Sequence, residues 1–359
     1  MLEVHPEGRC PISDTPVSGT TFCSLADAAD WISRHSGEGS AQACLHPGVH
    51  RLREPISLNN SHSGSRWATC ASAAGGRAVI SGGLNIPPSS WQREAGGLWA
   101  ASLPAGAAVK HLRTLWVGSV RANRTVLNAS ALLGDLRPTP TGYLTQHAVP
   151  WQSDAEEVEL NYFVQLAPWQ AQRCVLTHAA GHSLTVAQPC FASISERAAG
   201  VPGLPRNRSS GRTGCADSDP GCGLLGNPLG SGLPMFVENI PLDDPGLSQG
   251  SAAPGHFSFS PRQQKLLYSP HSHELSKDGK AFTADVVVPV SEGLIGGVGL
   301  RDASFVGIDF EHMAWNSPSH PAGFIDLQDG ETELGYILGG LDCSNCSDVS
   351  VVRARLFPK

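Results

Sequence analysis

The pattern of apolar and polar positions predicts a chain of short β-strands with one helix near its start. Residues 20–35 are the helical segment, because apolar side chains recur there at a spacing of three and four. Ser24 precedes this segment as an N-cap, with Asp27 three residues later in a capping-box arrangement. The residues of the apolar stripe are Leu25, Ala28, Ala29 and Ile32. A one-sided helix at the start of a strand-rich chain is suited to covering the exposed end of a β-solenoid.

Short apolar runs separated by turns dominate both ends of the chain. Between residues 42 and 83 the runs Ala43–His46, Val49–Leu52 and Ile56–Leu58 are separated by turn residues such as Pro47-Gly48. Strands of this length, separated by a few turn residues, have the dimensions of solenoid coils. The same pattern returns after Gly293, so we expect coils at both ends of the chain.

The segment 299–330 holds the strand with the clearest alternation. Val306, Ile308 and Phe310 are expected on an apolar face, and Asp309 and Glu311 on the opposite face together with Phe305 and Gly307. A turn-rich excursion follows through residues 315–322, and then a second short apolar run at 323–327. We interpret the whole segment as one coil that stacks on its neighbours.

The middle of the chain differs from the two ends. From residue 87 to about 289 the alternating segments are longer, which is typical of an antiparallel β-domain. Residues 197–234 are rich in Gly, Pro and Ser and are expected to form a disordered loop. The predicted domains are therefore 1–86 (cap helix and first coils), 87–289 (inserted β-sandwich) and 290–359 (resumed coils). The last of these holds few coils, so we expect it to be truncated.

Composition agrees with this all-β interpretation and argues against some classes of binding partner. The chain holds 40 Gly and 27 Pro, and charged residues make up only 16% of it, which favours short strands with many turns. The net charge of −7 and the lack of a Lys or Arg run argue against nucleic acid or an anionic membrane as partner. No stretch of eighteen residues is apolar enough to span a membrane.

Two features favour a secreted protein, although the first residues do not resemble a signal peptide. The chain has ten cysteines, and several Asn-x-Ser/Thr sequons that could carry glycans. The sequons begin at Asn59, Asn123, Asn128, Asn207 and Asn345.

Several cysteine pairs could form disulfides, but the sequence leaves their pairing open. Cys10 with Cys23 and Cys44 with Cys70 are possible bridges, and Cys215 with Cys222 could staple the long loop. Cys174 and Cys190 would lie on the two arms of a hairpin that turns at Gly181-His182. Cys343-x-x-Cys346 lacks a second close pair for zinc and a βαβ context for redox chemistry, so we interpret it as a structural or free thiol pair.

Motifs along nearly the whole chain resemble the pectin-lyase-like right-handed parallel β-helix proteins. The resemblance is closest to β-helix glycoside hydrolases of the β-xylosidase or α-L-fucosidase type, in which a β-sandwich interrupts the helix. The matching segments are Phe22–Leu25 with Ala28, His46–Gly48 with Leu52 and Pro55-Ile56, Ala78–Gly83 with Trp91, Glu238-Asn239, Asp244–Gly246, Leu267–Pro270, and Gly307–His312 with Trp315 and Gly323.

The resemblance implies a fold and, more loosely, a function. It implies a right-handed parallel β-helix with an N-terminal cap helix, interrupted by an antiparallel β-sandwich. It further implies a carbohydrate-active protein, a glycoside hydrolase or a fragment of one acting on cell-wall polysaccharide. In the relatives that this chain resembles, the catalytic acids lie on later coils, so no catalytic residue can be carried over. The alternatives are a non-catalytic carbohydrate-binding or surface module, and a polysaccharide lyase.

The residues themselves offer one candidate site for glycoside chemistry. The Cα atoms of Asp309 and Glu311, two residues apart on one strand, would be about 6.5–7 Å apart. Carboxyl groups separated by roughly 6.5–9.5 Å suit an inverting glycosidase, in which one donates a proton and the other activates water. His312, Trp315 and Asp326 are candidate substrate contacts. Polar residues on an outward face exposed to water explain the pattern equally well.

Two further clusters could bind a metal, and each has a simpler explanation. Asp326, Asp329, Glu331 and Glu333 could hold Ca²⁺, the only cofactor considered, but their spacing matches no known calcium loop and an exposed acidic turn explains them. His271-x-His273-Glu274 lacks a third clear ligand and is typical of a solvated loop. We therefore predict no metal site from the sequence.

Overall fold

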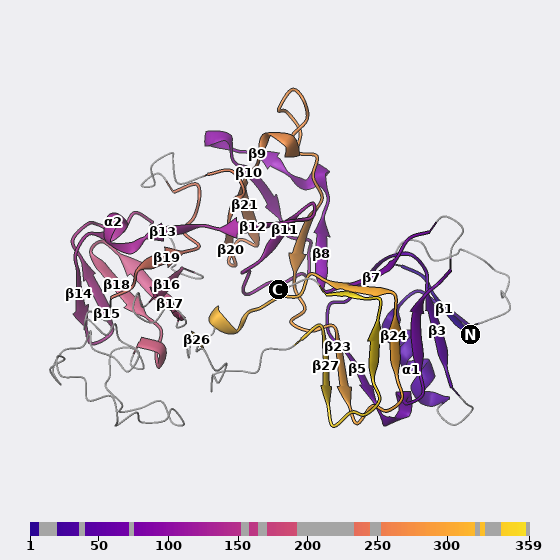
Figure 1. Ribbon diagram of the computed structural model, residues 1–359. Helices are drawn as coiled ribbons and strands as arrows, with labels where there is room; N and C mark the ends of the chain where they lie inside the picture. The colour runs from indigo at the N-terminus through magenta and orange to yellow at the C-terminus, as the bar shows by residue number, and fades with distance from the viewer. Residues whose placement is uncertain are drawn as a thin grey trace, which may run out of the picture. The chain divides into compact units, whose positions relative to one another are not determined.

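The described part of the chain folds mainly into short β-strands joined by turns and irregular segments. The computed structural model describes residues 1–6, 20–35, 40–71, 75–151, 158–163, 171–191, 233–244, 253–319, 324–326 and 339–356. Most of the regular structure is strand, with few helices (Figure 1). The chain divides into two compact units. The first unit comprises Met1–Asn85, Val287–Trp315 and Leu338–Lys359, and the second comprises Ile86–Val286 and Asn316–Ile337.

Three parallel sheets make up the first unit. In each sheet, strands from before residue 86 pair with strands from after residue 290, so the chain rejoins the same sheets after leaving the unit. The first sheet has the order β2 (Thr20–Phe22), β1 (Leu2–Val4), β3 (Gln42–Leu45), β6 (Arg66–Thr69), β24 (Ser304–Val306), β28 (Ser350–Val352). The second has the order β27 (Leu341–Ser344), β23 (Ile295–Val298), β5 (Ile56–Asn59). The third has the order β29 (Arg355–Leu356), β25 (Ile308–Glu311), β7 (Ala78–Ser81), β4 (Gly48–Arg51).

The core of the first unit is formed by apolar side chains from these three sheets and from α1 (Leu25–Arg34). The predicted helix is confirmed over Leu25–Arg34, but the first residues of the predicted range, Thr20–Phe22, form strand β2. The Ser24 side chain accepts a hydrogen bond from the Asp27 N–H (3.1 Å), as a cap should. The buried face of the helix consists of the four predicted residues, Leu25, Ala28, Ala29 and Ile32.

The prediction of one continuous strand through residues 305–311 is wrong. Gly307 adopts a φ of +71°, a conformation that L side chains rarely adopt, and the backbone bends there. As a result β24 and β25 belong to different sheets, and the alternation restarts at Ile308. Phe305, predicted to face outward, is fully buried and packs edge-on against Phe310 with ring centroids 6.4 Å apart.

Disulfides close three loops of the described chain. The bridges are Cys44–Cys70, Cys174–Cys190 and Cys343–Cys346, and no described cysteine is free. The Cys44–Cys70 bridge, one of the possible pairings that the sequence left open, is therefore present. Cys23 is also disulfide-bonded, whereas Cys10, Cys215 and Cys222 lie outside the described residues, as does most of the predicted loop 197–234.

The second unit is mainly antiparallel. Part of one sheet has the order β11 (Leu115–Val117), β12 (Val120–Arg124), β20 (His256–Ser260), β21 (Lys265–Ser269), β10 (Trp99–Ser102), β9 (Gln92–Arg93). The other has the order β13 (Val126–Asn128), β19 (Phe236–Glu238), β16 (Glu159–Phe163), β17 (Ala171–Ala180), β18 (Ser183–Val186), β15 (Gly142–Thr145), β14 (Leu136–Thr139). A short helix, α2 (Ala129–Leu133), follows β13. Strands β8 (Gly83–Ile86) and β22 (Val286–Pro289) lie where the chain passes between the units.

The segment after Trp315 does not complete a coil of the first unit as predicted. Its strand β26 (Phe324–Asp326) pairs antiparallel with β17 of the second unit, with Asp326 beside Ala171. The chain therefore enters the second unit a second time before it returns at residue 338. The predicted hairpin at Gly181-His182 is confirmed, since β17 and β18 pair antiparallel across that turn.

Candidate functional site

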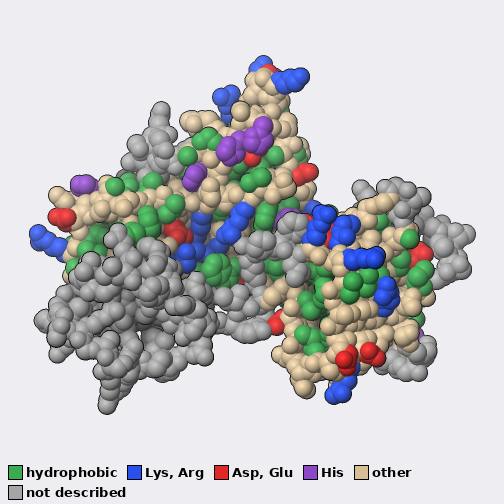
Figure 2. Space-filling model, in the orientation of Figure 1, with side chains coloured by type: hydrophobic (Ala, Val, Ile, Leu, Met, Phe, Trp, Pro, Cys, Tyr) green, Lys and Arg blue, Asp and Glu red, His purple; other side chains and the backbone are tan. Residues whose placement is uncertain are grey.

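The third sheet of the first unit places charged side chains in two rows. The strand register aligns Glu311 with Ser81 and Arg51, and aligns Asp309 with Val79 and with Arg355 of β29. Basic residues are present elsewhere too. Figure 2 shows that Lys and Arg side chains gather in several separate groups on the face drawn, so charge alone does not single out one site.

Asp309 is held in place by two arginines. Its side chain is only 5% exposed, and its two oxygens accept hydrogen bonds from Arg77 Nε (2.7 Å) and Nη2 (2.6 Å). The Arg355 backbone N–H donates a further bond of 3.0 Å to Oδ1. Such a bidentate, charge-assisted pair fixes both oxygens of the carboxylate. Asp309 thereby links β25, β29 and the residue that precedes β7.

Glu311 has a different environment from Asp309. Its side chain is about a quarter exposed (23%). Burial raises the pKa of the Glu311 carboxyl, the negative charge of Asp309 raises it further, and Arg355 opposes both effects. A carboxyl group that keeps its proton at a higher pH than usual, and that solvent can reach, has the properties of a general acid.

His312 lies next to Glu311, at a turn that directly follows β25. Its Nδ1 is 3.0 Å from Ser81 Oγ and 3.8 Å from Glu311 Oε2. Burial and, to a smaller extent, the nearby charge of Arg51 together lower the pKa of His312 to about 4. The imidazole is therefore neutral at neutral pH, where it can form hydrogen bonds to a substrate but no ion pair with Glu311.

Two glycines allow the His312 turn to approach the sheet. A Cβ at Gly82 would lie 2.9 Å from the His312 carbonyl oxygen. A Cβ at Gly83 would lie 3.1 Å from His312 Cβ and 2.2 Å from Val287 Cγ1. Neither position has room for a side chain. The Gly-Gly pair, which the sequence indicated only as a turn, is thus a requirement of this site.

A pocket of about 290 Å³ lies beside this sheet within the first unit. It is near the small end of ligand pockets, which start at about 300 Å³. Gly83 and Arg51 belong to its wall, and the Arg51 guanidinium donates a hydrogen bond to the Gly83 carbonyl oxygen (3.0 Å). The lining residues are Cys23, Ser24, Leu25, His50, Arg51, Leu52, Arg53, Gly83 and Leu84.

The other predicted site residues do not all belong to the first unit. Trp315 is partly buried and belongs to the first unit, a few residues after Glu311 and His312. Asp326 belongs to the second unit, in β26. The remaining members of the predicted acidic cluster, Asp329, Glu331 and Glu333, lie outside the described residues.

The motif at residues 271–274 serves a structural purpose. Both oxygens of the buried Glu274 carboxylate accept bonds from the Tyr268 hydroxyl (3.0 and 2.9 Å), and one also accepts from the His271 N–H (2.7 Å). The His271 and His273 rings stack with centroids 5.4 Å apart. Glu274 is engaged within its own turn, as expected for a residue that stabilises a loop.

The sequons in the described chain are all exposed. Asn59, Asn123, Asn128 and Asn345 have solvent-exposed side chains, and Asn207 lies outside the described residues. Asn59 and Asn128 also act as N-caps, accepting bonds from Ser61 N–H (2.9 Å) and Ala131 N–H (3.0 Å) respectively. Their glycosylation stays a prediction.

Sequence reasoning missed a buried ionic network in the second unit. Glu159 is fully buried, and Arg113, Arg124 and Ser319 all contact its carboxylate. Glu238 joins the network through the same two arginines, and it also contacts Arg173 (3.6 Å) and Asn161 Nδ2 (2.8 Å). The members come from positions spread over more than two hundred residues, so no local motif could have revealed them.

The charges of the network control the ionisation of its members. Burial alone would raise the pKa of Glu159, but Arg113 and Arg124 outweigh it and lower the pKa to about 2. Burial lowers the pKa of the Arg113 guanidinium. The Glu159 carboxylate is therefore ionised at neutral pH and depends on its pairing with Arg113 and Arg124 for stability.

Comparisons with known proteins identify the kind of fold but not the activity. No protein family model matches the chain, and no curated protein matches it. A solved structure named "Glycoside hydrolase" matches with a TM-score of 0.60 and 18% sequence identity, covering 91% of this chain. This chain spans about half (53%) of the length of that protein. The fold is therefore glycoside-hydrolase-like. Within the described residues, no helix has the length and apolar character needed to cross a membrane.

Proposed function

We propose that the first unit is a right-handed parallel β-helix capped by α1. In this proposal, residues 1–86, 290–315 and 338–359 supply its coils, and the β-sandwich of residues 87–289 is inserted between the first two of these segments. The three all-parallel sheets, in which strands from both ends of the chain pair directly, support it. Successive coils of a β-helix give this arrangement, because each turn contributes one strand to each sheet.

We further propose that this chain is a carbohydrate-active protein of the glycoside hydrolase kind, acting on cell-wall polysaccharide. The observation that carries this proposal is the fold match over 91% of the chain to a protein named "Glycoside hydrolase". The disulfides are compatible with an extracellular setting, where such polysaccharides occur. Because one fold can host many activities, the assignment of chemistry depends on the site itself.

In the proposed site, Glu311 donates the proton to the glycosidic oxygen. Its raised pKa keeps it protonated to a higher pH than an ordinary glutamate, and the charge of Asp309, which pairs with Arg77, contributes to that shift. Neutral His312 and the indole of Trp315 contact the sugar through hydrogen bonding and stacking. The engaged oxygens of Asp309 make it better suited to tuning Glu311 than to activating water.

The bonding of Asp309 favours one alternative, a module that binds carbohydrate without cleaving it. Glycoside hydrolysis usually requires a second carboxylate that acts as base or nucleophile. Both oxygens of Asp309, the nearest candidate, are bonded to Arg77. A site with one available acid could bind a saccharide and leave it intact.

The release of reducing ends from a panel of cell-wall polysaccharides tests the proposal. We expect hydrolysis by the wild type and a loss of at least about 10²-fold in Glu311→Gln, the lower end of what a general acid contributes. Glu54→Gln, an exposed glutamate of the same unit, should retain full activity. Full activity in Glu311→Gln would overturn the assignment of the acid. Binding to an oligosaccharide array with no release of reducing ends would establish the binding module instead.

A further inference from the structure

Three potential ligand side chains converge on the first sheet of the first unit, on strands other than those of the proposed sugar site. Glu3 lies in β1, and His5, two residues later, projects to the same side of the extended chain. The ladder continues beyond the ends of the strands, since Val4 pairs with Leu45 and the His46 N–H donates to the Val4 carbonyl oxygen (2.8 Å). His46 is thereby placed beside His5 in the neighbouring strand.

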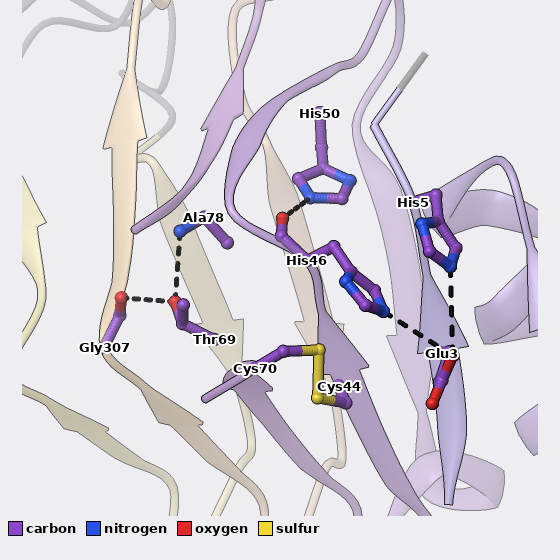
Figure 3. The surroundings of a disulfide bond; sticks show 9 residues. All are labelled: Glu3, His5, Cys44, His46, His50, Thr69, Cys70, Ala78 and Gly307. Carbon is purple, nitrogen blue, oxygen red and sulfur yellow. Dashed lines mark hydrogen bonds and ion pairs between the residues drawn. A yellow bond between two sulfur atoms is a disulfide. The ribbon is translucent and has the colours of Figure 1, made fainter. Parts of the chain in front are cut away.

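The convergence is visible at the level of single atoms. The Nε2 atoms of His5 and His46 lie 3.9 and 3.6 Å from the same oxygen of Glu3, Oε2 (Figure 3). One ligand atom from each residue lies within 4.8 Å of the ligand atoms of the other two. Among the described residues, no other group of three or more histidine, cysteine, aspartate or glutamate side chains is this closely spaced. The two imidazole rings stack with centroids 3.9 Å apart.

One nitrogen of this cluster lacks a hydrogen-bond partner. His46 Nε2 is buried from solvent and makes no hydrogen bond with any described residue. Its separation of 3.6 Å from Glu3 Oε2 is too long for a hydrogen bond. Buried polar atoms without a partner are rare in folded proteins, and each requires an explanation. A metal ion would provide one, because a neutral imidazole nitrogen is a common metal ligand.

The backbone around the cluster is held on several sides. The His5 N–H donates to the Phe22 carbonyl oxygen (2.9 Å), and His50 Nε2 is 2.9 Å from the His46 carbonyl oxygen. The Cys44–Cys70 disulfide lies directly beside Glu3, which pairs with Cys44 in the strand register (Figure 3). Ligands on a stapled sheet are preorganised, which reduces the cost of assembling a site.

We propose that Glu3, His5 and His46 bind a divalent transition-metal ion of the Zn²⁺ class. Two imidazoles and one carboxylate are a ligand set that Zn²⁺ uses in open sites, with water in the fourth position. Bonds of about 2.0–2.2 Å place the ligand atoms of a tetrahedral ion about 3.4 Å apart. The observed separations of 3.6 and 3.9 Å need only a small contraction and a rotation of the stacked rings.

Isothermal titration calorimetry of Zn²⁺ binding to the tag-free protein tests this proposal. We expect one equivalent of Zn²⁺ to bind the wild type, and Co²⁺ in its place to show the visible absorption of a four-coordinate ion. His46→Ala and Glu3→Gln should each weaken Zn²⁺ binding at least about tenfold, the lower end of the cost of losing even an outer-shell partner.

The matched control is the double variant His271→Ala/His273→Ala. This pair is also stacked, and both of its histidines are exposed, but the neighbouring Glu274 is engaged by Tyr268, so Zn²⁺ binding should be unchanged. Circular dichroism and thermal unfolding without metal should show that the Glu3 and His46 variants are folded. The absence of stoichiometric binding by the wild type would overturn the proposal, as would equally tight binding by the folded His46→Ala and Glu3→Gln variants.

Discussion

At the scale of single residues, Asp309 and Glu311 show how far two neighbouring carboxyl groups can differ. They lie two positions apart on β25, yet Asp309 is buried against Arg77 while Glu311 keeps a quarter of its side chain in solvent. The sequence pattern indicates only that both project from the same face. The pairing with Arg77 depends on β7 lying beside β25, and their residues are more than two hundred positions apart.

The pKa of Glu311 provides a prediction at this scale. Arg355 lowers that pKa, against burial and Asp309, which raise it. Arg355→Gln should therefore raise the pKa of Glu311 further, and the alkaline limb of a pH–activity profile should move to higher pH. Carbon-detected NMR titration of the Glu311 carboxyl measures the shift directly. Arg353→Gln, two residues earlier in the chain, is the control and should leave the pKa in place; a pKa of Glu311 unchanged in Arg355→Gln would contradict the electrostatic account.

At the scale of elements, the local sequence pattern predicted whether a segment is helix or strand more reliably than where a strand is interrupted. The helix α1 and its buried stripe follow from spacing and capping alone. The strand through residues 305–311 was predicted correctly as β-structure, but not its division between two sheets. A glycine with positive φ looks the same in sequence as a glycine inside a strand, and only the packing of Phe305 against Phe310 reveals the bend.

The buried network of the second unit leads to a prediction at this scale, because it joins β12, β16 and β19. Replacing one partner of a buried ion pair typically costs about 3–5 kcal/mol, since the remaining charge stays buried without compensation. Glu159→Gln should therefore destabilise the second unit by about that amount at pH 7, as measured by urea unfolding. Glu94→Gln removes a solvent-exposed pair with Lys265 and should cost less than about 1 kcal/mol.

The pH dependence of stability distinguishes this ionic effect from lost packing. The pKa of Glu159 falls from 4.5 to about 2 in the folded state, so the folded chain binds this proton less readily than the unfolded chain. Its contribution to stability is fully present above about pH 4.5 and is lost as the pH falls towards 2. Glu159→Gln should lack this component, so the difference in stability between wild type and variant should shrink in acid. A constant difference would contradict the ionic role.

At the scale of the whole molecule, disulfides stabilise each unit separately. Cys44–Cys70 spans 26 residues and lies in the first unit, Cys174–Cys190 spans 16 in the second, and Cys343–Cys346 spans 3 in the first. The shortest bridge packs over Gly297, where a Cβ would lie 2.8 Å from Cys343 Sγ. The bridges therefore differ chiefly in how much of the unfolded chain they constrain.

The length of these loops predicts the cost of removing each bridge. On the chain-entropy model, a 26-residue loop contributes about 3.5 kcal/mol and a 3-residue loop about 1.6 kcal/mol. Cys44→Ala/Cys70→Ala should accordingly lower the unfolding free energy of the first unit about twice as much as Cys343→Ala/Cys346→Ala. Urea unfolding of the two double variants measures the difference. An equal loss in both would show that local packing, rather than loop entropy, determines the effect.

The sequence by itself determined the local features of this protein: the all-β character, the capped helix α1 and the hairpin at Gly181-His182. These follow from side-chain spacing, turn residues and capping, which act over a few residues. Only the tertiary structure decided which side chains meet: Arg77 with Asp309, Glu159 with Arg113 and Arg124, and His46 with Glu3 and His5. Each of these contacts depends on strand register between distant segments, because a shift of one residue would move every side chain to the opposite face.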